Sequence, residues 1–115
     1  TSAHVFALRL DENLFFANIR KLEDLVLMEV AENKDVRDVV LMCSAVNFID
    51  FSALEGLEEL NHRLEDAGVR LHLSEVKGPV MDRLQRSFFL HAVSGEIFLS
   101  QHEAMVTLDP QHFSS

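Results

Sequence analysis

A carboxylate and a hydroxyl, Asp50 and Ser52, lie two residues apart at a point where a strand pattern ends and a helix pattern begins. The run Val39–Cys43 before them is apolar and rich in β-branched residues, which is typical of a buried strand. After them, leucines recur at helical spacing from residue 54 to residue 64. A carboxylate or a hydroxyl at a helix start can cap the helix, and the hydroxyl can also carry a phosphate. We therefore treat Asn47–Glu55 as the candidate functional stretch.

Ser52 has two interpretations. Residues 52–55 match the Ser-x-x-Glu capping box, in which Ser52 accepts from the Glu55 N–H and Glu55 reaches back to the Ser52 N–H. Such a cap contributes about 1 kcal/mol to stability. A phosphate on Ser52 would also suit a helix N-terminus, because the N–H groups and the helix dipole attract negative charge. Asp50 and Glu55 would repel that phosphate.

Asp50 is the alternative N-cap of the same helix. Capping at Asp50 would pair Ile49 with Leu54 as a hydrophobic staple, whereas capping at Ser52 would place Phe51 opposite a glycine. If Ser52 is the cap, Phe51 lacks a local partner. The Phe51 ring is then either packed under a neighbouring loop or exposed as a contact for another protein.

We expect neither an enzyme nor a metal site. The six histidines are scattered, and none pairs with another histidine or with Cys43 at metal-ligand spacing. The chain contains no Gly-rich phosphate loop, no Gly-x-Ser-x-Gly and no Cys-x-x-Cys motif. Asp50 as a phospho-accepting aspartate, with Asp11, Glu12 and Lys77 around it, would need a first strand that leads into a helix. The sequence instead predicts a hairpin after the first strand. Cys43 lies inside an apolar strand run and is predicted to be a buried reduced thiol.

Composition predicts one folded domain over residues 1–115, with a tail from about residue 110. The 115 residues are 48% hydrophobic and 25% charged, which is ordinary for a globular chain. Nine phenylalanines without tryptophan or tyrosine predict that most of the aromatic mass is core. A net charge of −9 argues against nucleic acid and an anionic membrane surface, and favours a partner with a basic patch. No run approaches the roughly 18 apolar residues of a membrane span, so we expect no membrane insertion of this segment.

Hydrophobic periodicity predicts an α/β fold with strands and helices in alternation. The predicted strands cover 4–10, 14–16, 36–43, 69–74 and 97–99. The predicted helices start with Asn18 as N-cap, at the Asp50–Ser52 junction, at Gly78-Pro79 and with Ser100 as N-cap. They end near residue 32, at Gly68, after a stripe that reaches Phe88, and at Leu108.

The predicted order is β-β-α-β-α-β-α-β-α. The turn at residues 11–13 is too short for a crossover helix, so the first two strands should form an antiparallel N-terminal β-hairpin. Alternation after the second strand implies parallel pairing through right-handed crossovers. The prediction is a small α/β sandwich with a mostly parallel central sheet and helices packed on it.

The stretch Asn47–Leu54 resembles the strand-loop-helix signature of STAS domains, usually written Asp-Ser-Ser-Gly-Leu. STAS domains occur as free anti-sigma-factor antagonists and as the cytoplasmic C-terminal part of SulP anion transporters. The resemblance covers nearly the whole chain and implies an anti-sigma-factor-antagonist-like fold. Two further stretches, Leu14–Asn18 and Gly78–Leu84, resemble the transporter branch more than the free antagonists.

Carried over by position, Ser52 matches the serine that a cognate kinase phosphorylates in the antagonist branch, and Asp50 matches the aspartate before it. Phe51 stands where the signature has its first serine, and Ala53 stands where it has glycine. Both side chains crowd the approach that a kinase needs, which fits a transporter domain that has kept the docking surface without the switch. We expect a partner or regulatory loop made of Asp50, Phe51, Ser52, Ala53 and Glu55.

The resemblance implies a non-catalytic regulatory and protein-interaction domain of a SulP-type sulfate or related anion transporter. It would lie in the cytoplasm as part of an inner- or plasma-membrane transporter, and dock through the loop between the third predicted strand and the second predicted helix. Its partner would be the transmembrane domain of the parent transporter or a cytosolic regulatory protein. The resemblance also implies weak nucleotide binding near the same loop, which no phosphate-loop motif supports. The alternative is a free-standing anti-sigma-factor antagonist that acts as a phospho-switch at Ser52.

Overall fold

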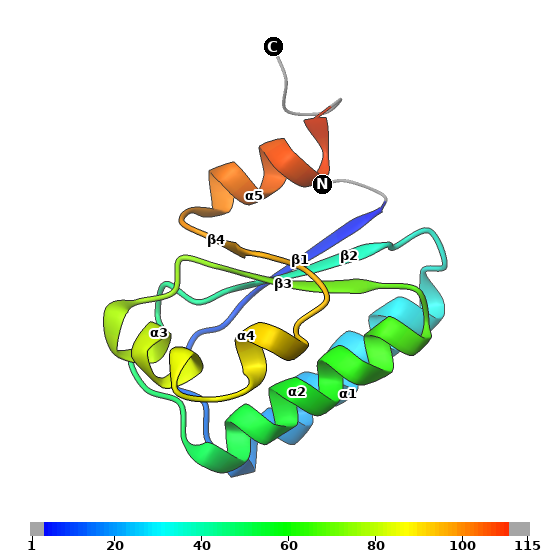
Figure 1. Ribbon diagram of the computed structural model, residues 1–115. Helices are drawn as coiled ribbons and strands as arrows, with labels where there is room; N and C mark the ends of the chain where they lie inside the picture. The colour runs from blue at the N-terminus through cyan, green and yellow to red at the C-terminus, as the bar shows by residue number, and fades with distance from the viewer. Residues whose placement is uncertain (1–3, 111–115) are drawn as a thin grey trace.

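A four-stranded parallel sheet with helices on both faces makes up the computed structural model, which describes residues 4–110 (Figure 1). The elements in chain order are β1 (Val5–Arg9), α1 (Phe16–Glu32), β2 (Asp38–Met42), α2 (Phe51–Asp66), β3 (Arg70–Ser74), α3 (Gly78–Gln85), α4 (Phe89–Ala92), β4 (Ile97–Phe98) and α5 (Gln101–Leu108). The predicted α/β class with a parallel central sheet is confirmed. The predicted tail beyond residue 110 lies outside the described residues.

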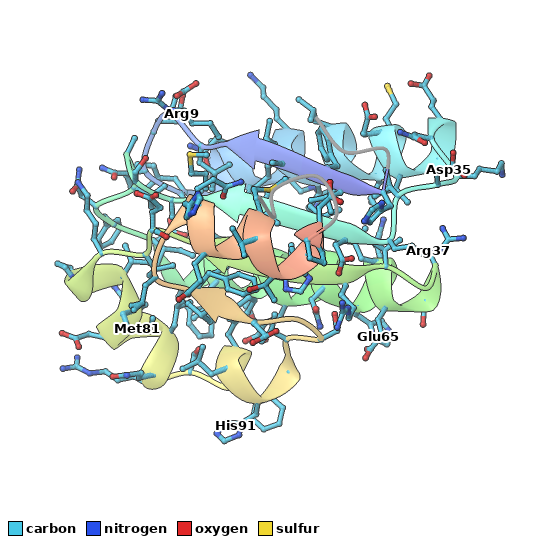
Figure 2. All side chains as sticks on the ribbon, turned by 90° about the horizontal axis from the view of Figure 1, so that it is seen from above. Arg9, Asp35, Arg37, Glu65, Met81 and His91 are labelled. Carbon is cyan, nitrogen blue, oxygen red and sulfur yellow. The ribbon has the colours of Figure 1, made fainter. Side chains whose placement is uncertain are left out.

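The strands lie in the order β1-β2-β3-β4, so each crossover places the next strand beside the one before it. Because all strands are parallel, their carboxyl ends meet at one end of the sheet. Figure 2 shows Arg9 and Met81 at this end, and Asp35 and Arg37 at the opposite end. The segments that follow β1, β2 and β3 therefore come together at the end that carries the candidate site.

The two faces of the sheet have different cores. Val39, Leu41 and Leu71 belong to the larger core cluster, which is covered by α1, α2, α3 and α4. Val40, the residue between the first two of these, belongs to a smaller cluster beneath α5. This alternation follows from the pleat, which points successive side chains to opposite faces. His72 is paired with Val40 in the β2–β3 register, so it lies on the α5 side.

Helix α2 ends and packs as its sequence predicts. Its predicted apolar stripe is buried from Leu54 to Leu64. Gly68, just past the C-cap residue, has a φ of +77°, a left-handed conformation that glycine adopts without a Cβ penalty. Gly56 allows α1 to approach closely, since a Cβ at this position would lie 2.6 Å from Cγ1 of Ile19.

The predicted antiparallel hairpin is wrong. Leu14 forms an isolated parallel bridge with Ile49: the Leu14 N–H donates to the Phe48 carbonyl at 3.0 Å, and the Asp50 N–H donates to the Leu14 carbonyl at 3.1 Å. The chain after β1 therefore continues along the segment that follows β2 instead of turning back. The short apolar run at 14–16 fits either a strand or a helix start, and α1 begins within it, at Phe16.

Three predicted details at helix ends need correction. Asn18 is not the N-cap of α1, because it lies inside the first turn, where its side-chain oxygen accepts from the Phe15 N–H at 2.8 Å. The stripe of α3 does not reach Phe88, which is 69% exposed, because α3 ends at Gln85 and a turn leads into α4. Ser100 does cap α5 as predicted, but the Glu103 carboxylate reaches back to the Leu99 N–H.

Candidate docking site at the start of α2

The segment between β2 and α2 is held by both neighbouring segments. Oδ1 of Asn13, which follows β1, accepts from the N–H groups of Asn47 at 2.7 Å and Phe48 at 3.2 Å. From the other side, Nζ of Lys77 donates to Oδ1 of Asn47 at 3.0 Å. Figure 1 shows this segment running beside α3 down to the start of α2. Side chains on it are therefore presented from a braced loop.

Asp50, and not Ser52, caps α2. Oδ1 of Asp50 accepts from the Ala53 N–H at 2.7 Å. The staple expected for this register is in place, because Ile49 and Leu54 are both buried. The capping box predicted at residues 52–55 is therefore wrong, and the alternative N-cap, Asp50, is confirmed. Capping at Asp50 is favoured because it places an apolar residue at both staple positions.

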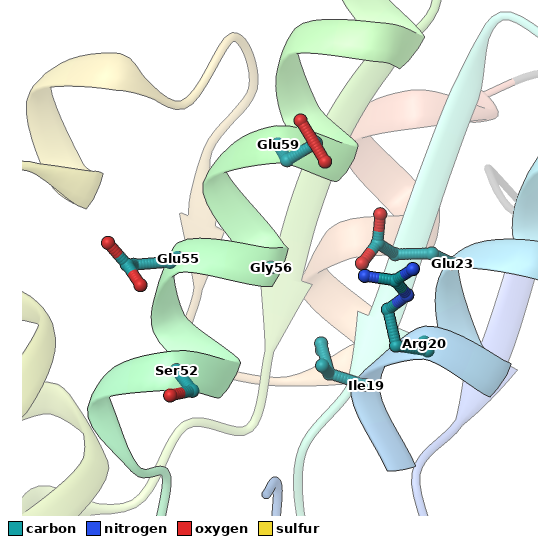
Figure 3. A pocket seen from close by; sticks show the side chains of 7 residues that line it. All are labelled: Ile19, Arg20, Glu23, Ser52, Glu55, Gly56 and Glu59. Carbon is teal, nitrogen blue, oxygen red and sulfur yellow. The ribbon is translucent and has the colours of Figure 1, made fainter. Parts of the chain in front are cut away.

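Ser52 lies half-buried in a cleft of about 250 Å³ between α1 and α2. Figure 3 shows the residues that line it: Ile19, Arg20 and Glu23 from α1, and Ser52, Glu55, Gly56 and Glu59 from α2. Because Asp50 takes the capping role, no hydrogen bond occupies the Ser52 hydroxyl within residues 4–110.

The cleft that contains Ser52 is acidic. Burial raises the pKa of Glu23 above its ordinary value of 4.5, and the neighbouring Glu59 raises it further, against the effect of Arg63 and Arg20. Burial, with a contribution from Glu55, also raises the pKa of Glu58. The lining itself carries three carboxylates, Glu23, Glu55 and Glu59, against Arg20 as the one cation among its lining residues.

Three phenylalanines are exposed around the junction. Phe51 is 67% exposed on the first turn of α2, and Phe15 and Phe48 are 43% and 41% exposed. The Phe15 and Phe48 ring centroids are 5.7 Å apart, and the Arg83 guanidinium lies 5.5 Å from the Phe48 ring centroid. We call Phe15, Phe48 and Phe51 the junction phenylalanines. With Phe88 they make four exposed residues among the seven phenylalanines whose burial the structure describes, so the expectation that most of the aromatic mass is core is wrong for this part of the chain.

The five predicted site residues do not act as one group. Asp50 is a cap, and Ala53 is fully buried in the core. Ser52 and Glu55 line the cleft between α1 and α2, whereas Phe51 is exposed to solvent. Sequence reasoning missed Phe15 and Phe48 as site residues. No local sequence signal marks them, because their exposure depends on how distant segments meet at the end of the sheet.

The reactive side chains near the junction are buried or engaged in structural contacts. Cys43 is a buried free cysteine, as predicted, and burial raises the pKa of its thiol to about 12. Lys77 is engaged by Asn47, and Asp50 by the helix it caps. Residues 4–110 contain no group of three metal-ligating side chains. In the same part of the chain, no helix has the length and apolar character needed to span a membrane.

The sequence of this fold matches a known class of domain. The STAS domain model matches residues 1–104, and the chain belongs to the STAS domain family. The chain is 30% identical to sulfate transporter 3.2 of Arabidopsis thaliana over 119 residues, covering 95% of this chain and 18% of the transporter. The chain thus spans less than a fifth of that relative's length.

Solved structures of two kinds share the fold. The STAS domain of a SulP transporter from Vibrio cholerae superposes with a TM-score of 0.80 at 16% identity, covering 100% of this chain and 88% of that one. The anti-sigma factor antagonist SpoIIAA in its unphosphorylated form gives a TM-score of 0.68 at 14% identity, covering 98% and 94%. The resemblance to STAS domains is confirmed: the chain is similar in sequence to a sulfate transporter, and it shares its fold with an anti-sigma factor antagonist.

Proposed function

We propose that this chain is a non-catalytic regulatory and protein-docking domain of a SulP-type sulfate or related anion transporter, and that it docks through the β2–α2 junction. The observation that carries the proposal is the exposure of Phe51, which is 67% exposed on a helix whose cap is already complete. Phe51 belongs to neither core cluster, and Phe15 and Phe48 are exposed near the same junction. Clustered exposed aromatic side chains are typical of protein contacts.

The partner is the transmembrane domain of the parent transporter or a cytosolic regulatory protein, on the cytoplasmic side of an inner or plasma membrane. The similarity to a sulfate transporter of which this chain matches 18% supports a place within a longer transport protein. The net charge of −9 opposes direct contact with nucleic acid or with an anionic bilayer. The domain itself conducts no anion in this proposal.

The test uses the parent transporter with this domain deleted and the domain supplied as a separate chain. Phe51→Ala should weaken association by at least about tenfold, as expected for loss of an aromatic anchor, and should impair sulfate uptake accordingly. Leu99→Ala is the control, since Leu99 is 88% exposed between β4 and α5. Unchanged association in the Phe51 variant would contradict docking through the junction. A parent reading frame without a series of apolar spans would contradict the transporter assignment.

The second candidate is a free-standing anti-sigma-factor antagonist that is switched by phosphorylation of Ser52. The observation that favours it is the unused Ser52 hydroxyl at the start of α2, where backbone N–H groups and the helix dipole stabilise a phosphate. The acidic side chains of the neighbouring cleft oppose it, because a phosphate adds a charge of about −2 next to them.

Incubation with a cognate anti-sigma kinase and ATP, followed by mass spectrometry, separates the two candidates. The switch requires one added phosphate on Ser52 and none in Ser52→Ala. An unmodified chain under conditions in which the kinase modifies its known substrate would eliminate the switch and leave the docking domain.

A further inference from the structure

A cleft of about 330 Å³ lies between the segment before α2 and helix α3. Phe48, Ile49 and Pro79 give it apolar walls, and Arg83 and Arg86 add two positive charges. Asp82 is the one carboxylate among its lining residues. Lys77 lies beside it, joined to the cleft by its hydrogen bond to Asn47. We call these residues the cationic cleft.

The three cations of the cationic cleft have no carboxylate partner in the described structure. Ion pairs there involve other basic side chains, and none joins Lys77, Arg83 or Arg86 to an acidic group. Lys77 donates to an amide oxygen, and Arg83 lies over the Phe48 ring. All three residues are exposed. Contacts thus orient Lys77 and Arg83, and none of the three positive charges is neutralised by an ion pair among the described residues.

The start of α3 adds to the positive potential. Lys77 is the N-cap residue of this helix, and its side chain makes no capping hydrogen bond to the first turn. The helix dipole places partial positive charge at this end, next to Pro79 in the cleft wall. The chain as a whole carries a charge of −9, so the cationic cleft differs in sign from the rest of the molecule.

We propose that the cationic cleft binds an acidic segment of the partner protein. An aromatic or aliphatic side chain of that segment packs between Phe48 and Pro79, and its carboxylates meet Lys77, Arg83 and Arg86. Charge complementarity favours this occupant, because carboxylates would neutralise the exposed basic side chains and an apolar side chain would pack against the apolar walls. The inference rests on the proposed docking function and deepens it. The net charge alone predicts a partner with a basic patch, whereas this cleft calls for an acidic segment.

The probe is a synthetic peptide with Asp and Glu on both sides of one Phe, titrated into the ¹⁵N-labelled 115-residue chain. A second peptide carries Lys in place of every acidic residue, and a third replaces Phe by Ser. The acidic Phe peptide should shift the amide signals of Phe48 and Gly78–Arg86 and bind about tenfold tighter than either of the other two. Added salt should weaken it.

Charge reversal provides the matched variants. The double variant Arg83→Glu, Arg86→Glu should reverse the preference, so that the Lys peptide binds more tightly than the acidic peptide. Arg9→Glu, Arg63→Glu makes the same change in net charge at exposed positions outside the cleft lining, and should keep the original preference. Circular dichroism confirms that each variant is folded.

Tighter binding of the Lys peptide to the unmodified chain, or signal shifts confined to α2, would overturn the proposal. Displacement of the acidic peptide by ATP or inorganic phosphate at lower concentration would reassign the cleft to a phosphate group, and tighter binding to phosphatidylserine vesicles would reassign it to a membrane. Phe51 does not line this cleft. If Phe51→Ala loses docking but the unmodified chain does not bind the acidic peptide, only this inference fails. If the unmodified chain binds the acidic peptide but Phe51→Ala docks normally, only the proposed docking through the junction fails.

Discussion

Nε2 of His72 lies 2.8 Å from Oδ1 of Asp38, and both residues are buried on the α5 side of the sheet. The other ring nitrogen, Nδ1, accepts from the Glu96 N–H at 2.9 Å. Because Nδ1 accepts a hydrogen bond, Nε2 carries the proton of the ring and donates a hydrogen bond to the Asp38 carboxylate. Nη2 of Arg70 also lies 3.1 Å from the same carboxylate oxygen. One histidine thus connects β2 to the segment that enters β4.

His72→Ala should lower the free energy of unfolding by about 2–4 kcal/mol, measured by urea denaturation. The substitution leaves the Asp38 carboxylate buried with Arg70 alone and removes the acceptor of the Glu96 N–H. His62→Ala is the control, because His62 is 74% exposed and pairs with an exposed Asp66 at 3.8 Å. The control should change stability by less than about 0.5 kcal/mol. Equal effects of the two substitutions would show that the buried pair contributes nothing special.

Gly56→Ala should destabilise the chain by about 1 kcal/mol. A methyl group at position 56 would meet the buried Ile19 side chain at 2.6 Å, and overpacking of this kind outweighs the helix propensity gained. Gly78→Ala is the matched control, because a Cβ at position 78 meets nothing within 4 Å. The control should be unchanged or slightly stabilised. A stabilised Gly56 variant would mean that α1 and α2 separate easily.

Asp50→Ala should cost about 1 kcal/mol of unfolding free energy, and Ser52→Ala should cost less than about 0.5 kcal/mol. The reason is that the Ala53 N–H bonds to Asp50, so only the first substitution removes a capping acceptor. Thermal unfolding of the two variants side by side measures the difference. A larger loss in Ser52→Ala would restore Ser52 as the cap.

Glu23→Gln should make the chain more stable than the original at pH 7 and equally stable below about pH 4. Burial raises the pKa of Glu23 in the folded chain, so the carboxyl group stabilises the fold while protonated. That contribution is complete below the ordinary value of 4.5 and is lost as pH rises through the raised folded value. Unfolding in urea at a series of pH values gives the difference curve.

Asp35→Asn is the control for the pH series, since it removes one negative charge at an exposed position after α1. A difference curve of the same size in this variant would assign the effect to the net charge of −9, and not to the burial of Glu23.

Hydrophobic periodicity predicted the helices and central strands because each buries one face of its own. The stripe from Leu54 to Leu64 and the run Val39–Cys43 carry that information locally. The direction that the chain takes after β1 could not be predicted from neighbouring residues. It depends on the Asn13 side chain meeting the backbone of residues 47 and 48, 34 and 35 positions away. A short apolar run such as 14–16 cannot report such a partner.

The position of the strand-to-helix junction was predicted, but the structural roles of its residues were predicted only in part. The sequence places Asp50 and Ser52 at the junction, and the staple pair Ile49 and Leu54 already distinguished the two caps. The exposure of Phe48 and the uncompensated charge of Arg83 could not be predicted, because both depend on how α3 lies against a loop distant in sequence. Local sequence patterns are enough to predict helix ends, whereas a surface formed by three loops can be predicted only when the fold is known.

The strand order of this sheet repeats the order of the strands along the chain. Each strand after the first therefore emerges from the ribosome when one of its neighbours has already been synthesised, so the sheet can grow one strand at a time. Helix α5 follows all four strands along the chain and supplies Ala104 and Leu108 to the smaller core cluster. The larger cluster has no member from α5 among the described residues, so it can form while α5 is still being synthesised, whereas the opposite face of the sheet stays uncovered until that helix has emerged.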